Sequence, residues 1–325
     1  MKMNLNLETW KIKGRFSISR FSISQSNVLT VELRDDGLIG RGECEPHEFD
    51  AELAQDVFDS IEKNRAVIEA GISRQELDDL LPAGPARNAI DCALWDLEAK
   101  RIGRRAWEIA GVTLNSPLTT AYTISLSNPR EMALHASNNC TRPLLKLKLG
   151  KKESLAIVNA VRQAAPEARL IVDVNEAWNI DDLNRLADPL SELGVELIEQ
   201  PLPAGEDKQI SNYLGPVPLC ADESCLDTNS LSTLTDIYSY VNIKLDKTGG
   251  LSEALRLVEA AKNYGFGIMV GCMNGTSLAM APAMVIGAMA EYCDLDGPLL
   301  LEQDRIPGLF YENSLIHVPT TDVWG

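Results

Sequence analysis

The sequence is poor in histidine and contains no pair of zinc-type CxxC motifs. Only His47, His135 and His317 occur in 325 residues, and none lies at the end of a strand predicted for the C-terminal two thirds of the chain. These absences argue against a histidine-based catalytic triad and against a zinc site. The seven cysteines are scattered and odd in number, which suits reduced thiols better than a disulfide framework.

The chain also lacks runs of lysine and arginine and long apolar stretches. Its 47 acidic residues outnumber 30 Lys and Arg, which gives a formal net charge of −17 at pH 7. This charge repels phosphate backbones and anionic lipid, so we expect no nucleic-acid partner and no membrane partner. Residues 1–16 alternate in polarity and have no signal-peptide core, and no later segment is apolar enough to span a bilayer. A cytoplasmic enzyme is the expectation.

Residues 1–112 predict an α+β domain. The first 45 residues or so alternate in polarity like a three-stranded meander, with a turn signal at residues 35–37. Helical segments follow, and a capping box of Ser73 and Glu76 introduces one of them. The last, over residues 86–100, carries one apolar stripe and ends before a glycine.

From about residue 117 the pattern changes to apolar strand, turn and amphipathic helix, repeated. The eight strand candidates are TTAYTISL, LLKLKLG, RLIVDVN, VELIEQP, PLCADES, YVNIKL, GIMVGC and EYCDLDG. Eight strands with intervening helices predict a closed α/β barrel over residues 113–302. A doubly wound open sheet is the alternative, but YTISLSNPRE lacks the glycine-rich phosphate loop that it needs. The tail, residues 303–325, holds no further βα unit and is expected to complete the N-terminal domain.

Three acidic residues end three consecutive predicted strands. Asp173, Glu199 and Asp222 each lie one βα unit after the last, near the strand end where such barrels carry their chemistry. Inward charges in a barrel are costly unless they are paired or bound to a metal. Structural ion pairs with lysine would explain one acid, but they explain three clustered anions poorly. Because carboxylates are hard oxygen donors, the sequence predicts one Mg²⁺ per subunit on these residues.

Lysines precede and follow the three acids. Side chains alternate along a strand, so Lys146 and Lys148 on the second predicted strand point the same way, and Lys244 ends the sixth. The second and sixth strands of an eight-stranded barrel are nearly opposite. Lys148 and Lys244 are therefore predicted to be two opposed bases, which implies inversion at a stereocentre, while Lys146 could hydrogen-bond a substrate carboxylate.

Five motifs occur in order and together resemble the muconate-lactonizing subgroup of the enolase superfamily over nearly the whole chain. They are the Lys-x-Lys pair, Asp-x-Asn-x-x-Trp at Asp173, Glu-Gln-Pro from Glu199, Ala-Asp-Glu-Ser around Asp222, and Lys-x-x-Lys-x-Gly-Gly from Lys244. The resemblance implies an α+β capping domain closing over a (βα)7β-type modified TIM barrel.

The eighth strand bears on the substrate. Asp294 and Asp296 form an Asp-x-Asp that is similar to the one in dipeptide epimerases, whose paired carboxylates hold the α-ammonium of a dipeptide. An exposed acidic turn is the alternative, since DxDG is a common turn composition. Muconate cycloisomerases and succinylbenzoate synthases handle acidic substrates without an ammonium, and two inward aspartates would repel these. The resemblance thus implies an isomerase that inverts the C-terminal residue of a dipeptide by 1,1-proton transfer.

Among dipeptide epimerases the sequence is most similar to those acting on L-Ala-D/L-Glu in bacterial murein peptide recycling. The resemblance implies that Arg20 binds the glutamate side chain and that Thr123 and Cys272 contact substrate; a solvated arginine and core packing are the respective alternatives. Residues 47–50 depart from the tyrosine- and glycine-containing loop of related epimerases. Their acidic members, Glu48 and Asp50, would favour a cationic substrate residue if they face the site.

Three competing functions remain. An epimerase for cationic or hydrophobic dipeptides, a cycloisomerase and an N-acylamino-acid racemase are compatible with the same scaffold. A non-catalytic binding protein needs neither two opposed lysines nor three metal ligands. A homo-oligomer is compatible with the sequence but not indicated by it.

Overall fold

The N-terminal part of the chain folds around a three-stranded antiparallel sheet. The computed structural model describes residues 1–46 and 54–325. The sheet has the order β1-β2-β3 and is formed by β1 (Lys2–Ser17), β2 (Ser22–Asp35) and β3 (Leu38–Cys44). Asp36 and Gly37 form the two-residue turn between β2 and β3, both with positive φ, as tight hairpins require. The predicted meander is confirmed.

Helices cover one face of this sheet. They are α1 (Ala54–Lys63), α2 (Arg65–Glu69), α3 (Arg74–Leu80), α4 (Pro85–Ile102) and α5 (Ala106–Ile109). The capping box of Ser73 and Glu76 opens α3, as predicted. Of the described helices, none combines the length and the apolar character needed to cross a bilayer.

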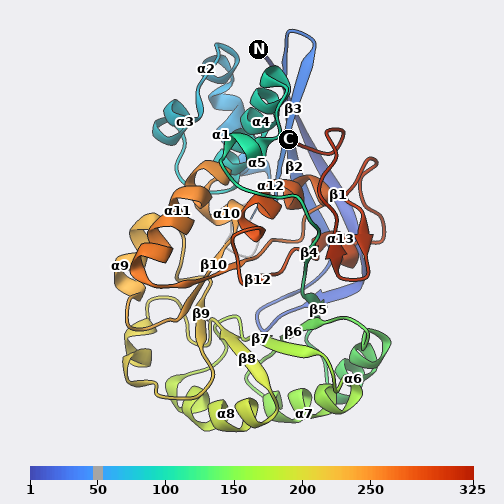
Figure 1. The fold of residues 1–325 in the computed structure, drawn as a ribbon, viewed down its shortest axis with the longest axis vertical. Helices are drawn as coiled ribbons and strands as arrows, with labels where there is room; N and C mark the ends of the chain where they lie inside the picture. Colours follow the sequence, from blue (N-terminus) through green and yellow to red (C-terminus); the bar gives the residue numbers. More distant parts are fainter. Residues whose placement is uncertain (47–53) are drawn as a thin grey trace.

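Helix α4 packs so closely on β3 that only glycine fits beneath it. A Cβ atom on Gly40 would lie 2.2 Å from Ala93 O, and one on Gly42 would lie 2.0 Å from Ala89 O. The opposite side of α4 faces α10 and α11 of the C-terminal part (Figure 1). The helix is therefore buried nearly all round. The single apolar stripe predicted from the sequence accounts for only one of its two buried sides.

The C-terminal part is a curled sheet of eight parallel strands in chain order. They are β5 (Tyr122–Ile124), β6 (Leu144–Lys148), β7 (Arg169–Asp173), β8 (Val195–Glu199), β9 (Leu219–Ala221), β10 (Tyr240–Ile243), β11 (Gly267–Val270) and β12 (Tyr292–Cys293). The amide of Ala121 donates to Cys293 O at 2.7 Å and joins the two edges. The predicted α/β barrel is confirmed, and the doubly wound alternative is wrong because the strand order never reverses.

Helices surround the barrel. They are α6 (Pro129–Asn138), α7 (Ser154–Ala164), α8 (Ile180–Glu192), α9 (Leu231–Leu234), α11 (Leu251–Tyr264) and α12 (Ser277–Gly287), with single turns at α10 (Leu245–Thr248) and α13 (Gly297–Leu300). Between β8 and β9 the described chain forms only a 3₁₀ turn, Asp207–Asn212, and a second 3₁₀ turn, Thr228–Ser230, precedes α9.

Successive side chains along each barrel strand point alternately out towards the helices and into the barrel, so they contribute to two separate hydrophobic cores. Leu145 and Leu147 point outward into the core shared with the helices, whereas Leu144 belongs to a separate cluster inside the barrel. That inner cluster also contains Ile171 and Leu197. Because the period is two, the polar residues that end these strands lie above an apolar floor.

Two segments connect the halves. The β1–β2 hairpin reaches down to the barrel (Figure 1), where Leu126 N donates to Ser17 O at 2.9 Å. The tail strands β13 (Tyr311–Glu312) and β14 (Leu315–Ile316) pair with each other, and β14 also pairs with β4 (Leu118–Thr119). The last residues reach α4, where Trp324 Nε1 donates to Cys92 O at 3.0 Å. The division of the chain at residues 112 and 302 stays a prediction.

Candidate active site

The strand register places the predicted acids at one level of the barrel. Lys148 on β6 pairs with Asp173 on β7, and Asp173 pairs with Glu199 on β8. Glu199 in turn pairs with Cys220 on β9, so Asp222 follows two residues later on the same face. One carboxylate oxygen from each of the three acids lies within 4.8 Å of the others, and all three residues are buried.

Lys146 lies at the centre of the acids. Its Nζ is 2.7 Å from Glu199 Oε2, 3.1 Å from Asp173 Oδ2 and 2.7 Å from Asp294 Oδ2, and the side chain is 1% exposed. Burial disfavours the ammonium, but these carboxylates outweigh it and hold the pKa of Lys146 well above its usual value. Lys146 is therefore a permanent cation in this arrangement.

Lys148 and Lys244 approach the acid cluster from different strands. Lys148 Nζ lies 2.5 Å from Asp173 Oδ2, and Lys244 Nζ lies 2.6 Å from Asp222 Oδ2. Strands β6 and β10 are four apart in a ring of eight, so the two lysines face each other across the barrel with the acids between them. The opposition that the sequence predicted is present. Burial works against the charge of Lys244, but Asp222 and Glu199 raise its pKa.

The three acids form a donor set that suits a hard divalent cation. All the donors are carboxylate oxygens. Among the described residues, Asn175 Oδ1 is buried without a hydrogen-bond partner, and Glu199 Oε2 is buried with no contact of this kind beyond its ion pair with Lys146. Burial, with the charge of Asp173, raises the pKa of Glu199 to about 8. Asp173 is also buried, but Lys148 and Lys146 lower its pKa to about 2. Among the described lysines, only Lys146 forms a close ion pair with Glu199, and a divalent cation would add positive charge beside this carboxylate.

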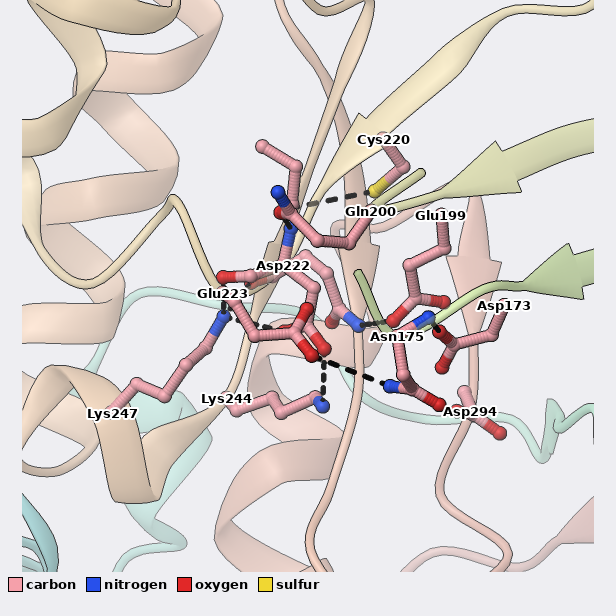
Figure 2. A network of polar contacts seen from close by, with 12 residues as sticks. Asp173, Asn175, Glu199, Gln200, Cys220, Asp222, Glu223, Lys244, Lys247 and Asp294 are labelled. Atoms are coloured by element: carbon pink, nitrogen blue, oxygen red, sulfur yellow. Dashed lines mark hydrogen bonds and ion pairs between the residues drawn. The ribbon is translucent and has the colours of Figure 1, made fainter. Parts of the chain in front are cut away.

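Further polar residues support these acids. Lys247 Nζ donates to Asp222 Oδ1 at 2.6 Å, and Asn242 Nδ2 donates to Glu199 Oε1 at 2.8 Å. The amide of Asp222 donates to Gln200 Oε1 at 2.9 Å. Figure 2 shows Lys244 and Lys247 on one side of Asp222, with Glu199 and Asp173 on the other. The sequence analysis assigned no role to these supporting residues, although Lys247 lies in the Lys-x-x-Lys-x-Gly-Gly motif and Gln200 in the Glu-Gln-Pro motif.

The Asp-x-Asp after β12 faces inward. Asp294 and Asp296 are 5% and 3% exposed, so the exposed-turn alternative is wrong. Asp296 Oδ2 accepts a hydrogen bond from Thr123 N at 2.6 Å, and Thr123 Oγ1 lies 3.5 Å from Asp294 Oδ1. Burial, with the charge of Asp294, raises the pKa of Asp296 to about 7. Cys272 borders the same space, and burial raises the pKa of its thiol.

Arg20 lies at the mouth of the site, where it already forms ion pairs with two glutamates. Its guanidinium pairs with Glu223 at 2.8 Å and with Glu176, which come from two different barrel loops. Neither glutamate was predicted from the sequence, because nothing in the local pattern links them to Arg20. Residues 47–50, and with them the prediction for Glu48 and Asp50, lie outside the described part of the chain.

A cavity of about 540 Å³ brings the predicted residues together. Its polar wall includes Arg20, Thr123, Lys146, Lys148, Asp222, Lys244, Cys272, Asp294 and Asp296. Phe16, Ile18 and Phe21 of the β1–β2 hairpin line its apolar part. Asp173 and Glu199 lie deeper, below the lining. The volume and the mixed lining suit a small polar molecule.

Two family models together span most of the chain. The model described as "Mandelate racemase / muconate lactonizing enzyme, N-terminal domain" matches residues 2–111, and the one described as "Enolase C-terminal domain-like" matches residues 133–322. The L-Ala-D/L-Glu epimerase of Escherichia coli (strain K12) is 42% identical, over 96% of this chain and 98% of that protein. An N-acetyl-D-glutamate racemase from a Pseudoalteromonas species is 48% identical, over 77% of this chain and 79% of the relative.

Solved structures agree with these relatives. An enolase family member from Agrobacterium tumefaciens with homology to dipeptide epimerases, with bound sodium and L-Ala-L-Glu, superimposes with a TM-score of 0.97 at 48% identity over 99% of both chains. A dipeptide epimerase from Methylococcus capsulatus, complexed with Mg and L-Arg-D-Lys, has a TM-score of 0.90 at 30% identity over 98% of both chains. The resemblance predicted from the motifs is confirmed, and the chain belongs to the mandelate racemase and muconate lactonizing enzyme family of the enolase superfamily.

Proposed function

We propose that the protein is an Mg²⁺-dependent dipeptide epimerase that inverts the α-carbon of the C-terminal residue. The observation that carries this proposal is the placement of Lys148 and Lys244 on opposite sides of one buried acid cluster. One base facing each side of a carbon is what inversion by proton removal and return requires. The relatives at the highest coverage are epimerases, which supports the same reaction.

Asp173, Glu199 and Asp222 would hold the cation, because one carboxylate oxygen from each converges on the same buried point. Bound there, Mg²⁺ would supply positive charge to the substrate carboxylate and to the negative charge that develops when the α-proton leaves. The cation held by the neighbour from Methylococcus capsulatus supports this choice of metal.

The lysines divide the proton transfer between them. Lys148 takes the α-proton from one face while Lys244 delivers a proton to the other face, and the reverse reaction exchanges these roles. Lys146, held as an ammonium by the surrounding carboxylates, donates hydrogen bonds to the substrate carboxylate. Its charge also stabilises the electron density that moves there when the α-proton leaves.

Asp294 and Asp296 would bind the dipeptide ammonium, and Thr123 and Cys272 would border the peptide. Both aspartates are buried at the cavity wall, which is where a substrate cation would find them. Two acids that face inward without an ammonium would repel the acidic substrates of cycloisomerases.

N-acylamino-acid racemization is the second candidate. The 48% identity to an N-acetyl-D-glutamate racemase supports it. So does the pairing of Asp294 with Lys146, together with the raised pKa of Asp296, because both reduce the negative charge offered to an ammonium. A neutral N-acyl group fits such a wall without a charge mismatch.

For specificity we propose L-Ala-D/L-Glu, acting in murein peptide recycling in the cytoplasm. Arg20 at the cavity mouth supports an acidic side chain, and the relative from Escherichia coli has this activity. A glutamate side chain would take the place of Glu176 or Glu223 on the guanidinium. Cationic dipeptides are the alternative, since Glu176 and Glu223 also border the cavity.

A dipeptide library incubated in D₂O with Mg²⁺ and read by mass increase tests reaction and specificity together. We expect free dipeptides to exchange and their N-acetylated forms not to, with Ala-Glu among the best substrates. Exchange confined to N-acylated amino acids would replace the epimerase by the racemase. Dominance of Lys or Arg dipeptides would leave the epimerase and remove the Ala-Glu assignment.

Arg20→Met is the matched variant for specificity. It should slow exchange of Ala-Glu and leave Ala-Leu nearly unchanged, because only the acidic side chain would meet the guanidinium. An equal loss for both dipeptides would contradict a role in side-chain selection.

A further inference from the structure

The segment that carries Lys244 is held by a helix from the N-terminal part of the chain. After β10 the chain forms the single turn α10, passes through Gly249 and Gly250, and enters α11. A single helical turn and two glycines with positive φ are a weak support for a side chain that must be placed accurately. The polar groups of this segment are bound instead by one face of α4.

Arg87 binds the end of α10. Its Nη2 donates to Thr248 O at 2.7 Å and its Nε to Gly249 O at 3.2 Å, two carbonyls that a terminating helix leaves exposed. The approach is close enough that a Cβ on Gly249 would lie 2.4 Å from Arg87 Nε. Arg87 is 8% exposed, so these bonds are sheltered from water.

Asn88 binds the residue two positions after Lys244. Its Nδ2 donates to Asp246 Oδ1 at 2.8 Å, and Glu45 N reaches the same oxygen at 3.3 Å. Asp246 is 6% exposed and borders the cavity. It has no part in the proton transfer described above, and its hydrogen bonds fix the first turn after the proposed base.

Asp91 caps the start of α11. Its carboxylate accepts from Ser252 N at 2.9 Å and from Ser252 Oγ at 2.5 Å, and Trp95 Nε1 donates to the same hydroxyl at 2.9 Å. A carboxylate at a helix N-terminus binds otherwise unpaired amides. A Cβ on Gly250 would lie 2.5 Å from Asp91, so this contact requires glycine at position 250.

We propose that Arg87, Asn88 and Asp91 are positioning residues for Lys244, acting through the segment from Asp246 to Ser252. Asp91 lies one helical turn after Arg87 and Asn88, so the three share one side of α4, and that side meets the segment at its beginning, middle and end. The proposal rests on the proposed function, because it concerns one of the two bases of that reaction.

In the described part of the chain, helix α4 supports the segment after Lys244 but not the segment after Lys148. The segment after Lys148 is fixed by barrel residues, with Trp178 Nε1 and Ser154 Oγ donating to Gly150 O at 3.0 and 2.9 Å. No contact between α4 and this segment occurs among the described hydrogen bonds. Loss of the α4 contacts should therefore displace Lys244 and leave Lys148 in place. A purely structural role for α4 would affect both bases alike.

The test measures α-proton exchange in D₂O separately from the two diastereomers of a dipeptide that the wild type epimerizes. Lys148→Ala and Lys244→Ala first assign each diastereomer to its base. Asn88→Ala and Asp91→Asn are then compared with Asp96→Asn. Asp96 is also buried on α4, but its carboxylate binds Arg41 N at 2.8 Å and Gly325 N at 2.7 Å instead of the Lys244 segment.

We expect Asn88→Ala and Asp91→Asn to slow the exchange assigned to Lys244 by roughly 10- to 100-fold relative to the exchange assigned to Lys148, since small displacements of a base have effects of this size. Asp96→Asn should leave the ratio of the two rates unchanged. If Asn88→Ala does not fold, Asn88→Ser, whose hydroxyl is too short to reach Asp246, takes its place.

Equal losses from both diastereomers, or the same ratio in Asp91→Asn and Asp96→Asn, would overturn the positioning role. A wild-type protein that exchanges no dipeptide at all would instead overturn the proposed function, so the two failures are distinguishable.

Discussion

Asp222 accepts hydrogen bonds from two lysines, Lys244 and Lys247. Lys244 donates to its Oδ2, whereas Lys247 donates to its Oδ1 at 2.6 Å and to its main-chain oxygen at 2.5 Å. Lys247 gives its third proton to Asn242 O at 3.0 Å, so its ammonium has no donor left for a substrate. The two lysines of the Lys-x-x-Lys motif therefore differ, because the described hydrogen bonds use all three protons of Lys247 but only one of Lys244.

Replacing Asp222 tests the metal assignment. Asp222→Asn should abolish turnover and weaken Mg²⁺ binding while circular dichroism shows unchanged helicity, because the amide keeps the shape and loses the charge. The isosteric change is preferred to alanine, which would leave two buried ammonium groups unpaired at a cost of several kcal/mol. Titration calorimetry measures the affinity. A variant with full activity would remove Asp222 from the metal ligands.

Single lysine variants separate the two halves of the reaction. Lys148→Ala and Lys244→Ala should each lose epimerization, since inversion needs both bases, while each retains α-deuterium exchange from one diastereomer. Mass spectrometry of each purified diastereomer after incubation in D₂O provides the measurement. Exchange from the same diastereomer in both variants is incompatible with bases on opposite faces.

At the scale of elements, the contact between α4 and the segment after β10 links stability to pH. Burial raises the pKa of Asp246 to about 7, from 3.8 in an unfolded chain. The folded protein therefore binds the proton that the unfolded chain has lost between these values, and the free energy of unfolding falls as pH rises from about 4 to 7. The contribution amounts to at most about 4 kcal/mol.

Asp246→Asn should flatten this dependence. The amide oxygen still accepts the bonds from Asn88 and Glu45, but the group no longer ionises. Urea unfolding of both proteins at several pH values between 4 and 8 measures the slope. Identical slopes in wild type and Asp246→Asn would show that Asp246 does not titrate in this window.

Much of the site could be predicted from the sequence because its residues lie at the C-terminal ends of strands. Asp173, Glu199 and Lys148 follow from alternation along strands and from the rule that parallel strands end at one rim. The pairing of Arg20 with Glu223 joins residues from separate loops, and no local periodicity reports such a contact. The contacts of the polar side of α4 were not predicted either, because the apolar stripe seen in the sequence marks only one side of a helix that is buried nearly all round.

At the scale of the whole molecule, buried lysines balance much of the negative charge of the acid cluster. In the structure the acids are already ion-paired with Lys146, Lys148, Lys244 and Lys247. The halves of the chain are joined elsewhere, through α4, the hairpin and the tail. We therefore expect the fold not to depend on the metal in the way that a small metal-nucleated domain does.

Chelation tests this independence. EDTA should abolish exchange of the substrate, and Mg²⁺ should restore it, while the melting temperature of the chelated protein stays close to that of the untreated protein. Added Mg²⁺ should raise the melting temperature only by the mass-action term set by its affinity. Loss of cooperative unfolding on chelation would show that the acid cluster needs the metal to fold.

The seam that closes the barrel lies at the substrate wall. Ala121 bonds to Cys293, and directly above them Thr123 bonds to Asp296, so strands from the two ends of the barrel sequence meet at the proposed ammonium site. Joining residues so far apart carries the largest loop-closure entropy of any strand pair in the sheet. We therefore expect this strand pair to be the last of the barrel to form, so that activity regained during refolding lags behind the helical signal. Regained activity would then indicate that the first and last strands of the barrel have paired.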